Sequence, residues 1–307
     1  MLQVLLQLSL RNLRIVNKTL SEWLYLRENT DARSRSIALT QSVASKLPSD
    51  KPVHILDLAT GTGSNIRHLI KHLPTRQQWL VTDKDQQLLA ELPTQTERWC
   101  QTQGYKFKRT KFGYVILGTH LECHIETQTL NLRNLDSTKL FHGYHLITAS
   151  ALLDLVSASW LRALINHCHA VGAAILFFST YNGSVSCSPA EHEDEQILKL
   201  FNLHQETDKG LGGRAEGPNA TTCAINCFSE TGYQVQHESS NWTLGTKDQE
   251  IQRQLITGWV KAVREIAPET ESMIKSWETR RLAHVDANRS KIIVGHDDIA
   301  ALPTEKT

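Results

Sequence analysis

The sequence lacks a charge imbalance and a zinc-binding pattern of cysteines, and each absence excludes a class of protein. Lysine and arginine together number 33 against 32 for aspartate and glutamate, so no global field draws the chain to nucleic acid or an anionic membrane. The six cysteines include no C-x-x-C pair with a second pair at zinc-ribbon spacing. His167, Cys168 and His169 are adjacent, and neighbours on a helix point in different directions. We therefore expect reduced thiols, a cytoplasmic location and no metal ion.

Long hydrophobic runs are missing as well. No stretch approaches the roughly 20 apolar residues of a membrane span. The apolar start MLQVLLQLSLRNL has no basic flank before it and no small-residue cleavage site after it, which argues against a signal peptide. Instead, the sequence predicts an amphipathic helix with four leucines on one face, Leu2, Leu6, Leu10 and Leu13. We expect a soluble, intracellular protein.

One basic segment, residues 98–111, interrupts the even distribution of charge. It contains no acid and five cations, Arg98, Lys106, Lys108, Arg109 and Lys111. Five charges give only weak, salt-sensitive binding to RNA or another anion. We interpret the segment as a solvated loop and keep an anion or RNA contact as the alternative.

The first regular unit is a strand, a glycine loop and a helix. The run VHILDLA (53–59) is typical of a strand buried on both faces. Behind the loop, a helix is predicted by apolar residues at i, i+3, i+4 and i+7, which are Ile66, Leu69, Ile70 and Leu73. Pro74 ends that helix.

The alternation of strand and helix then continues. Helices are predicted around 88–92, stopped by Pro93, and over 159–172, ending at Gly172. Further strands are predicted at 79–83, 113–132 (a hairpin), 144–150, 173–181, 233–244 and 291–299. Alternation at this spacing predicts an α/β fold: a doubly wound, mostly parallel sheet of seven strands with helices on both faces.

The domain organisation follows from where the alternation fails. We expect an N-terminal helical leader over 1–48 and one Rossmann-like domain over 49–307. Helical insertions follow strands five and six, at about 182–217 and 245–290. No internal repeat or low-complexity linker divides the chain.

The loop LDLATGTGSN (56–65) decides between nucleotide ligands. A dinucleotide site needs G-x-G-x-x-G, but Ile66 stands at the third glycine position. Asp57 would repel a pyrophosphate and attract a cationic amine, since unit charges about 4 Å apart interact by roughly 4 kcal/mol at an effective dielectric of 20. Asp83 ends the second strand, 20 residues beyond Gly63, and an acid there suits the ribose of NAD and of any adenosyl ligand alike.

These residues resemble one family. The pattern Asp57-x-Ala59-x-Gly61-x-Gly63 followed by Asp83 is similar to the class I S-adenosylmethionine-dependent methyltransferases. Their usual loop has glycine where Ala59 stands. The likeness covers about residues 50–185 and includes TLNL (129–132) and LITASALLDLVS (146–157).

The resemblance implies S-adenosyl-L-methionine as cofactor and a role for each matching residue. Asp57 would orient the methionyl ammonium, and Asp83 would hold the ribose. The methionyl moiety would lie against Ala59, Gly61 and Gly63, with Ser150 at its end. Asn131 and Leu132 would contact the adenine, with Asn131 where an acid is common.

A general base should come from the segment after strand five. His204 and Asp208 stand at i,i+4 in NLHQETDKGLGG, so they could share a helix face and set an imidazole for proton abstraction. Tyr181 ends strand five and could face the sulfonium. The glycines at 210, 212 and 213 would let the loop close as a lid. A solvated His–Asp pair is the alternative.

The leader segment WLYLRENTDARSR (23–35) could also cover the site. Trp23, Tyr25, Arg27 and Arg33 are available to a substrate, and an arginine can hold a carboxylate or phosphate bidentately. The alternative is a core tryptophan with solvated arginines.

We expect a cytoplasmic methyltransferase (EC 2.1.1.-) that acts on an oxygen or nitrogen of a small molecule. Three alternatives stay open: an RNA or protein methyltransferase docking through 98–111, a non-catalytic cofactor-binding scaffold, and a nicotinamide oxidoreductase. The segment SALLDL (150–155) lacks the Asn/Asp-Pro-Pro-aromatic motif of enzymes that methylate base amines. The sequence leaves the acceptor and the oligomeric state open.

Overall fold

A computed structural model describes residues 19–133, 135 and 138–304, and its centre is one mixed β-sheet. The strands lie in the order β3-β4-β5-β2-β1-β6-β7-β10-β8, and β9 pairs with β10. Their bounds are β1 (Val53–Leu58), β2 (Arg76–Asp83), β3 (Lys106–Arg109), β4 (Gly113–Leu117), β5 (Glu122–Thr129), β6 (Leu146–Ser150), β7 (Ala174–Ser188), β8 (Tyr233–Ser239), β9 (Trp242–Leu244) and β10 (Lys291–Pro303).

The parallel part of the sheet is its core, β5-β2-β1-β6-β7. The prediction of a mostly parallel sheet of seven strands is wrong in its direction and in its strand number. The described sheet has ten strands. Four of its strand pairings are parallel and five are antiparallel. The strands beyond the predicted seven are short ones. Two of them, β3 and β4, pair with each other at one edge of the sheet, and β9 pairs with one end of β10. The first of them lies inside the basic segment that we expected to be a loop.

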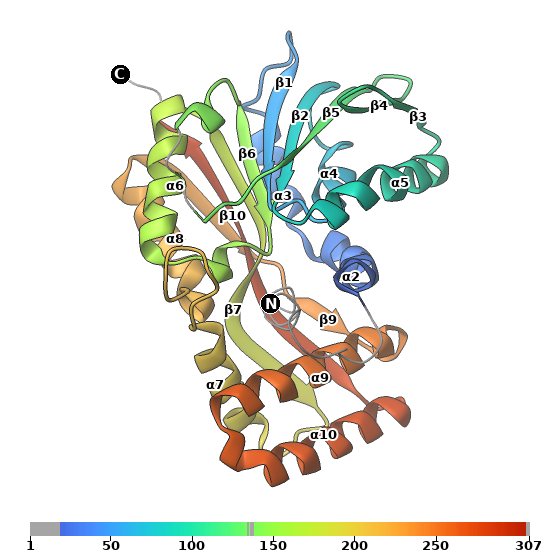
Figure 1. Cartoon of the computed structure of the whole chain (residues 1–307), viewed down its shortest axis with the longest axis vertical. Helices are drawn as coiled ribbons and strands as arrows, with labels where there is room; N and C mark the ends of the chain where they lie inside the picture. Colours follow the sequence, from blue (N-terminus) through green and yellow to red (C-terminus); the bar gives the residue numbers. More distant parts are fainter. Residues whose placement is uncertain (1–18, 134, 136–137, 305–307) are drawn as a thin grey trace.

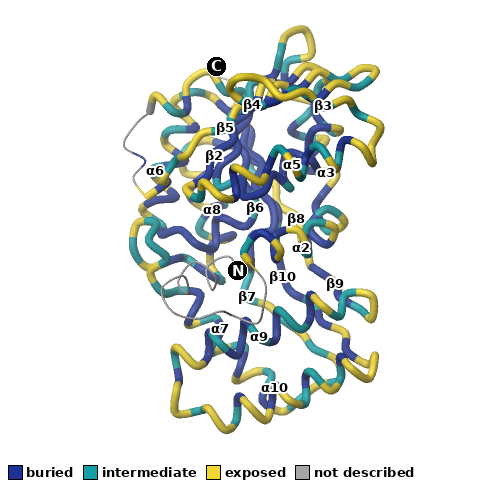
Figure 2. Tube along the Cα trace, turned by 45° about the vertical axis from the view of Figure 1, so that its right-hand side comes forward, coloured by how far each residue is buried: buried dark blue, intermediate teal, exposed yellow. Residues whose placement is uncertain are grey.

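Helices cover both faces of the parallel core (Figure 1). On one face lie α3 (Ile37–Ala44), α4 (Ser64–Leu69) and α5 (Gln86–Gln103), and on the other α6 (Ala158–Val171) and α8 (Ala220–Glu230). The side chains of β1 alternate between the two hydrophobic layers, so both faces of this strand are buried. Figure 2 shows this buried centre and the exposed outer surfaces of the helices.

Three helix ends test the sequence analysis, and the end predicted at Pro74 is wrong, because α4 already ends at Leu69. The predicted end of α6 is confirmed, since Gly172 has φ 68° and its N–H bonds the last turn. The predicted stop at Pro93 is wrong, because α5 continues to Gln103. Proline inside a helix costs about 3 kcal/mol, but α5 buries one continuous stripe against the sheet, formed by Leu89, Leu92, Thr96 and Cys100.

The long strands β7 and β10 continue past the parallel core and carry a second group of elements (Figure 1). We call the far ends of β7 and β10, with β9, α7 (Asp194–Gln205), α9 (Gln249–Ile266) and α10 (Glu271–Asp286), the lower lobe. Part of the segment expected as a helical insertion is thus strand, since β7 runs to Ser188. Short 3₁₀ helices complete the described chain: η2 (Thr138–Phe141), η3 (Leu153–Leu155), η4 (Gly217–Asn219), η5 (Thr246–Asp248) and η6 (Pro268–Thr270).

The first described helix, α2 (Leu20–Ser34), lies between the parallel core and the lower lobe. The Trp23 and Trp242 rings lie 6.4 Å apart, and the Trp242 indole donates to Asp31. The amphipathic helix predicted over the first leucines lies outside the described residues. No described helix is both long enough and apolar enough to cross a membrane.

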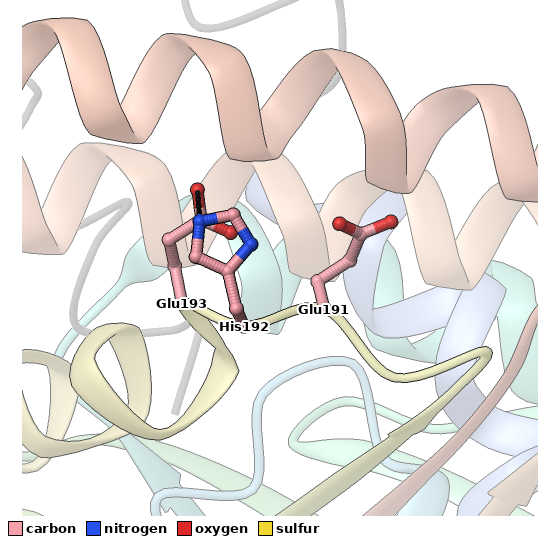
Figure 3. A group of neighbouring side chains, drawn as sticks. All are labelled: Glu191, His192 and Glu193. Atoms are coloured by element: carbon pink, nitrogen blue, oxygen red, sulfur yellow. Dashed lines mark ion pairs between the residues drawn. The ribbon is translucent and has the colours of Figure 1, made fainter.

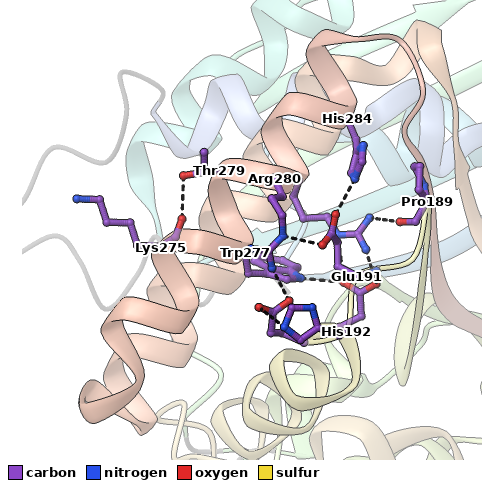
Figure 4. A network of polar contacts seen from close by, with 11 residues as sticks. Pro189, Glu191, His192, Lys275, Trp277, Thr279, Arg280 and His284 are labelled. Carbon is purple, nitrogen blue, oxygen red and sulfur yellow. Dashed lines mark hydrogen bonds and ion pairs between the residues drawn. The ribbon is translucent and has the colours of Figure 1, made fainter.

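A polar network joins α10 to the loop between β7 and α7 (Figure 4). Arg281 is fully buried; its guanidinium donates to both carboxylate oxygens of Asp194 and, at 2.7 Å, to the Pro189 carbonyl. The Trp277 indole also donates to Asp194. Since a buried guanidinium is costly without partners, this network fixes α10 on the lobe.

Replacing Arg281 with methionine should lower the free energy of unfolding by about 3 kcal/mol, because Asp194 would lose its cationic partner. Urea denaturation measures the change. The matched control is Arg253→Met, whose partner Asp286 has a side chain that is 62% exposed, so the loss there should stay below about 1 kcal/mol. Equal losses in the two variants would contradict a structural role for the buried pair.

Candidate active site

The loop between β1 and α4 has the backbone of a ligand cradle. Ala59, Gly61 and Gly63 all have left-handed φ angles, of 52°, 56° and 85°. The loop is tied to β2 by the Thr60 N–H, which donates to the Thr82 carbonyl at 2.8 Å. A Cβ on Gly61 would lie 3.0 Å from a methyl group of Leu24 in α2. The strand–loop–helix unit predicted from the sequence is therefore present, with α2 packed on top of it.

Two buried carboxylates hold this loop in place. Asp57 accepts from the Thr60 hydroxyl at 2.6 Å and from the Asn65 amide at 2.7 Å. Asp83, at the end of β2, accepts from the Gly61 N–H at 2.9 Å and from the Asp85 N–H at 2.9 Å. Burial raises the pKa of Asp57 to about 6 and also raises the pKa of Asp83. Both carboxylates keep further acceptor positions beyond these bonds.

A cavity of about 260 Å³ lies at the carboxyl ends of the parallel strands, and we call it the larger cavity. Asp83 and Ala59 line one side of it, and Leu132 and the exposed Asn131 line another. The remaining lining comes from the segments after β6 and α7, namely Ala151, Leu152, Leu155, Lys209, Gly210 and Leu211, and from three residues at the rim, Lys84, Leu130 and Arg133. A pocket at this edge of an α/β sheet is the general ligand position.

A second, nearly filled space of about 10 Å³, the smaller cavity, lies under α2. Asp57, Gly61, Ser150 and Arg27 all line it, and Ala59 lines both cavities. Four of the residues expected at the methionyl end thus line one space, whereas the fifth, Gly63, lines neither cavity.

Two arginines near the smaller cavity are buried, Arg27 and Arg35. The interpretation of solvated leader arginines is therefore wrong for Arg27, whereas Arg33 is 48% exposed. Arg27 of α2 pairs with Asp31 at 3.1 Å. Arg35, which the sequence analysis missed, donates to Asn65 and to the Ser150 hydroxyl at 3.1 and 3.0 Å. The spacing R-x₃-D-x₃-R over 27–35 was the available indication, since it repeats at one helical turn.

The backbone is strained at the same edge of the sheet. Ala59, Ala151 and Ser179 are non-glycine residues with φ of 52°, 54° and 56°. They follow or lie within β1, β6 and β7, which are neighbours in the sheet. Left-handed conformations cost about 1–2 kcal/mol per residue and cluster at functional sites. Of these three residues, the sequence pattern indicated Ala59 alone, as the residue that stands where glycine is usual.

The three residues expected to be catalytic have different surroundings in the structure. His204 is buried in the last turn of α7, with its Nε2 3.0 Å from Glu265, and burial lowers its pKa. Asp208 does not share its helix face, because α7 ends at Gln205. The Tyr181 hydroxyl donates to Asn202 at 2.8 Å. These three residues line neither the larger nor the smaller cavity.

The glycine-rich loop after α7 is packed against the site. The Leu211 carbonyl accepts from the Ser157 N–H at 3.1 Å, and the Glu216 N–H donates to the Val156 carbonyl at 2.8 Å. Gly210, Gly212 and Gly213 have left-handed φ angles. The loop therefore carries Lys209 and Leu211 into the wall of the larger cavity.

Glu191, His192 and Glu193 lie close together in the lower lobe (Figure 3), with ligand atoms within 4.8 Å of one another. Arg280 donates to both glutamates, and His284 lies 2.7 Å from Glu191 (Figure 4). These bonds use the carboxylate oxygens that a cation would need.

No family model and no curated protein matches the sequence. Among solved structures, the YcgJ protein of Bacillus subtilis has 11% identity and a TM-score of 0.45, over 88% of this chain and 98% of its own. A putative sarcosine dimethylglycine methyltransferase of Galdieria sulphuraria has 11% identity and a TM-score of 0.42, over 91% and 87%. Mycolic acid cyclopropane synthase CmaA1 has 11% and 0.44, over 88% and 85%.

With TM-scores below 0.5, we base no conclusion about this chain on these likenesses. The strand order and the loop after β1 define the fold instead. A parallel core flanked by an antiparallel β10, with helices on both faces and the glycine loop after its central strand, is a Rossmann-like α/β arrangement.

The raised pKa of Asp57 makes stability depend on pH. Since its folded pKa of about 6 exceeds the ordinary aspartate pKa of 3.8, the folded state binds more protons between these values. The Asp57 contribution is thus present at low pH and is lost as the pH rises through 6. Relative to Asp57→Asn, the wild type should lose up to about 3 kcal/mol between pH 4 and 7.5.

Urea unfolding at several pH values measures this difference in slope. Asp286→Asn on the surface of α10 is the matched control and should leave the slope unchanged. Parallel curves for the wild type and Asp57→Asn would show that Asp57 is ionised throughout.

Proposed function

We propose that the protein is an S-adenosylmethionine-dependent methyltransferase that acts on an oxygen or nitrogen of a small molecule. The observation that carries the proposal is the pair of adjoining cavities at the carboxyl ends of the strands, with Asp83 in the larger one and Asp57 and Arg27 in the smaller one. The larger cavity suits an adenosine, and the smaller cavity suits an amino acid that bears an ammonium and a carboxylate.

The larger cavity fits the adenosyl half. Asp83 has free acceptor positions for the two ribose hydroxyls, and Leu132 offers an apolar surface to the adenine. Asn131 lies at the rim, where its amide can reach a base edge. S-adenosylmethionine would supply a methyl group on a cationic sulfur.

The smaller cavity fits the methionyl half. Asp57 is a buried acceptor for an ammonium, and the absence of a Cβ at Gly61 keeps the backbone open beneath Leu24. Ser150 also lines this cavity. Because the space is now nearly filled, α2 has to move outward by a small distance when a methionyl group enters.

Arg27 is the group for the methionyl carboxylate. It lines the smaller cavity and lies in α2, directly above the loop. Its pairing with Asp31 uses Nε, which leaves the two terminal nitrogens for a bidentate bond to a carboxylate. We assign Asp57 and Arg27 to the opposite charges of one amino acid.

A small acceptor is favoured over RNA by the position of the basic segment. Lys106 and Lys108 are exposed on β3, the outermost strand of the sheet. Two strands, β4 and β5, separate β3 from β2, where Asp83 lies. By contrast, α2 and the glycine-rich loop both approach the cavities and narrow the access to them.

Calorimetry with S-adenosylhomocysteine tests the cofactor. The wild type should bind it, and Asp83→Asn should weaken binding by about 10- to 100-fold, because a hydrogen bond to a charged group contributes about 1.5–3 kcal/mol. Asp286→Asn should bind normally. Absence of wild-type binding at millimolar ligand would overturn the proposed function.

Arg27→Met should weaken S-adenosylhomocysteine binding by about 10-fold or more, because the carboxylate loses a charged partner. Binding of 5′-methylthioadenosine, which lacks the amino-acid tail, should not change. Arg33→Met, in the same helix but 48% exposed, is the control. Equal weakening of both ligands would show that Arg27 only stabilises α2.

A further inference from the structure

We propose that Lys209 is the proton acceptor of the methyl-transfer step, acting from the glycine-rich loop on the hydroxyl or amine of the acceptor. The inference deepens the proposed function and rests on it. It replaces the expectation that His204 would act as the base, since His204 is bonded to Glu265 away from both cavities.

Lys209 is the basic side chain of the larger cavity that is partly withdrawn from water. Lys84 and Arg133, which also line it, are exposed, whereas Lys209 is half-buried. Lys209 and Leu211 line the cavity together with Ala59 and Asp83. A base for an in-line transfer has to reach the donor pocket, and Lys209 lies in its wall.

The Lys209 nitrogen is held in a defined position. It donates to the His204 carbonyl at 2.7 Å and to the Thr207 hydroxyl at 2.6 Å. The His204 carbonyl belongs to the last turn of α7 and also accepts from the Thr207 N–H at 3.1 Å, which fixes its position. A neutral amine has two hydrogens and one lone pair. Both hydrogens are therefore used by these bonds, and the lone pair is left for the acceptor.

The surroundings favour a lysine that exchanges its proton near neutral pH. Burial lowers the pKa of Lys209 to about 8, although the charges of Glu265 in α9, Asp154 in η3 and Asp208 act in the opposite direction. The nearby His204 has a lowered pKa and stays neutral. A sulfonium in the same cavity would disfavour the ammonium further, because like charges repel.

The step balances as follows. Neutral Nζ takes the proton of the acceptor O–H or N–H while the electron pair of that atom forms a bond to the methyl carbon. The methyl–sulfur bond breaks, and its electron pair stays on sulfur, which becomes neutral. Lys209 ends as an ammonium and returns its proton to water.

A test without the acceptor compares two ligands. Protonated Lys209 should repel S-adenosylmethionine but not S-adenosylhomocysteine, whose sulfur is neutral, and the shared amino-acid tail titrates in both. In the wild type, the affinity ratio of the methionine to the homocysteine form should rise about tenfold between pH 6.5 and 9.5. The ratio should be independent of pH in Lys209→Met and low at every pH in Lys209→Arg.

The control is Lys199→Met, an exposed lysine of α7, which should follow the wild type. If the wild type binds neither ligand, the proposed function is wrong. If it binds both with a ratio that does not depend on pH, the inference about Lys209 is wrong while the proposed function stands. A constant ratio that increases in Lys209→Met would show that Lys209 stays protonated over this pH range, which also overturns its role as a base.

Methyl transfer from radiolabelled S-adenosylmethionine to a pool of small hydroxyl and amine metabolites gives the second measurement. Lys209→Arg and Lys209→Met should both lose 10²- to 10⁴-fold in rate and still bind S-adenosylhomocysteine. Wild-type turnover by Lys209→Arg would overturn the role as a base, because arginine keeps the charge but cannot take up a proton.

Discussion

The site depends on two buried carboxylates that accept hydrogen bonds from a loop which would otherwise be unstable. Ala59, Gly61 and Gly63 are all left-handed, and such a sequence of conformations needs outside support. Asp83 supplies it by binding the Gly61 N–H, and Asp57 by binding Thr60 and Asn65. The cost is that both acids are desolvated, so their pKa values rise. A ligand that donates to these acids, or brings a cation, would relieve that cost, which links the folding of the loop to its chemistry.

The second constraint is the position of α2 between the loop after β1 and the lower lobe. Leu24 packs on Gly61, and Trp23 packs on Trp242 of the lower lobe. The polar face of the same helix carries Arg27, whose partner Asp31 is bonded to the Trp242 indole. Consequently, the lower lobe influences the smaller cavity without lining it. A change in the packing of β9 is transmitted through Asp31 to the arginine above the loop.

The sequence alone predicted those elements that local periodicity and spacing determine. The buried strand β1, the glycine loop, the acid at the end of β2 and the cap of α6 at Gly172 were all predictable, because each is set by neighbouring residues. What it missed depends on distant contacts. Pro93 stays helical because α5 buries a stripe against the sheet, and β7 and β10 are long because they pair with each other. Arg35 is buried only because Asn65 and Ser150 meet it from other elements.

In the segment after α7, the end of the helix decides which side chain reaches the larger cavity. Spacing alone placed His204 and Asp208 on one face, but the helix ends between them, and Asp208 turns to accept from the Gly210 N–H. At the end of the helix, the His204 carbonyl accepts a hydrogen bond from the Lys209 nitrogen. The histidine thus contributes its backbone rather than its ring, while the lysine enters the wall of the larger cavity. In the proposed reaction, opening of the glycine-rich loop would withdraw Lys209 and uncover the larger cavity together, because the same stretch of backbone carries Lys209, Gly210 and Leu211, which all line this cavity.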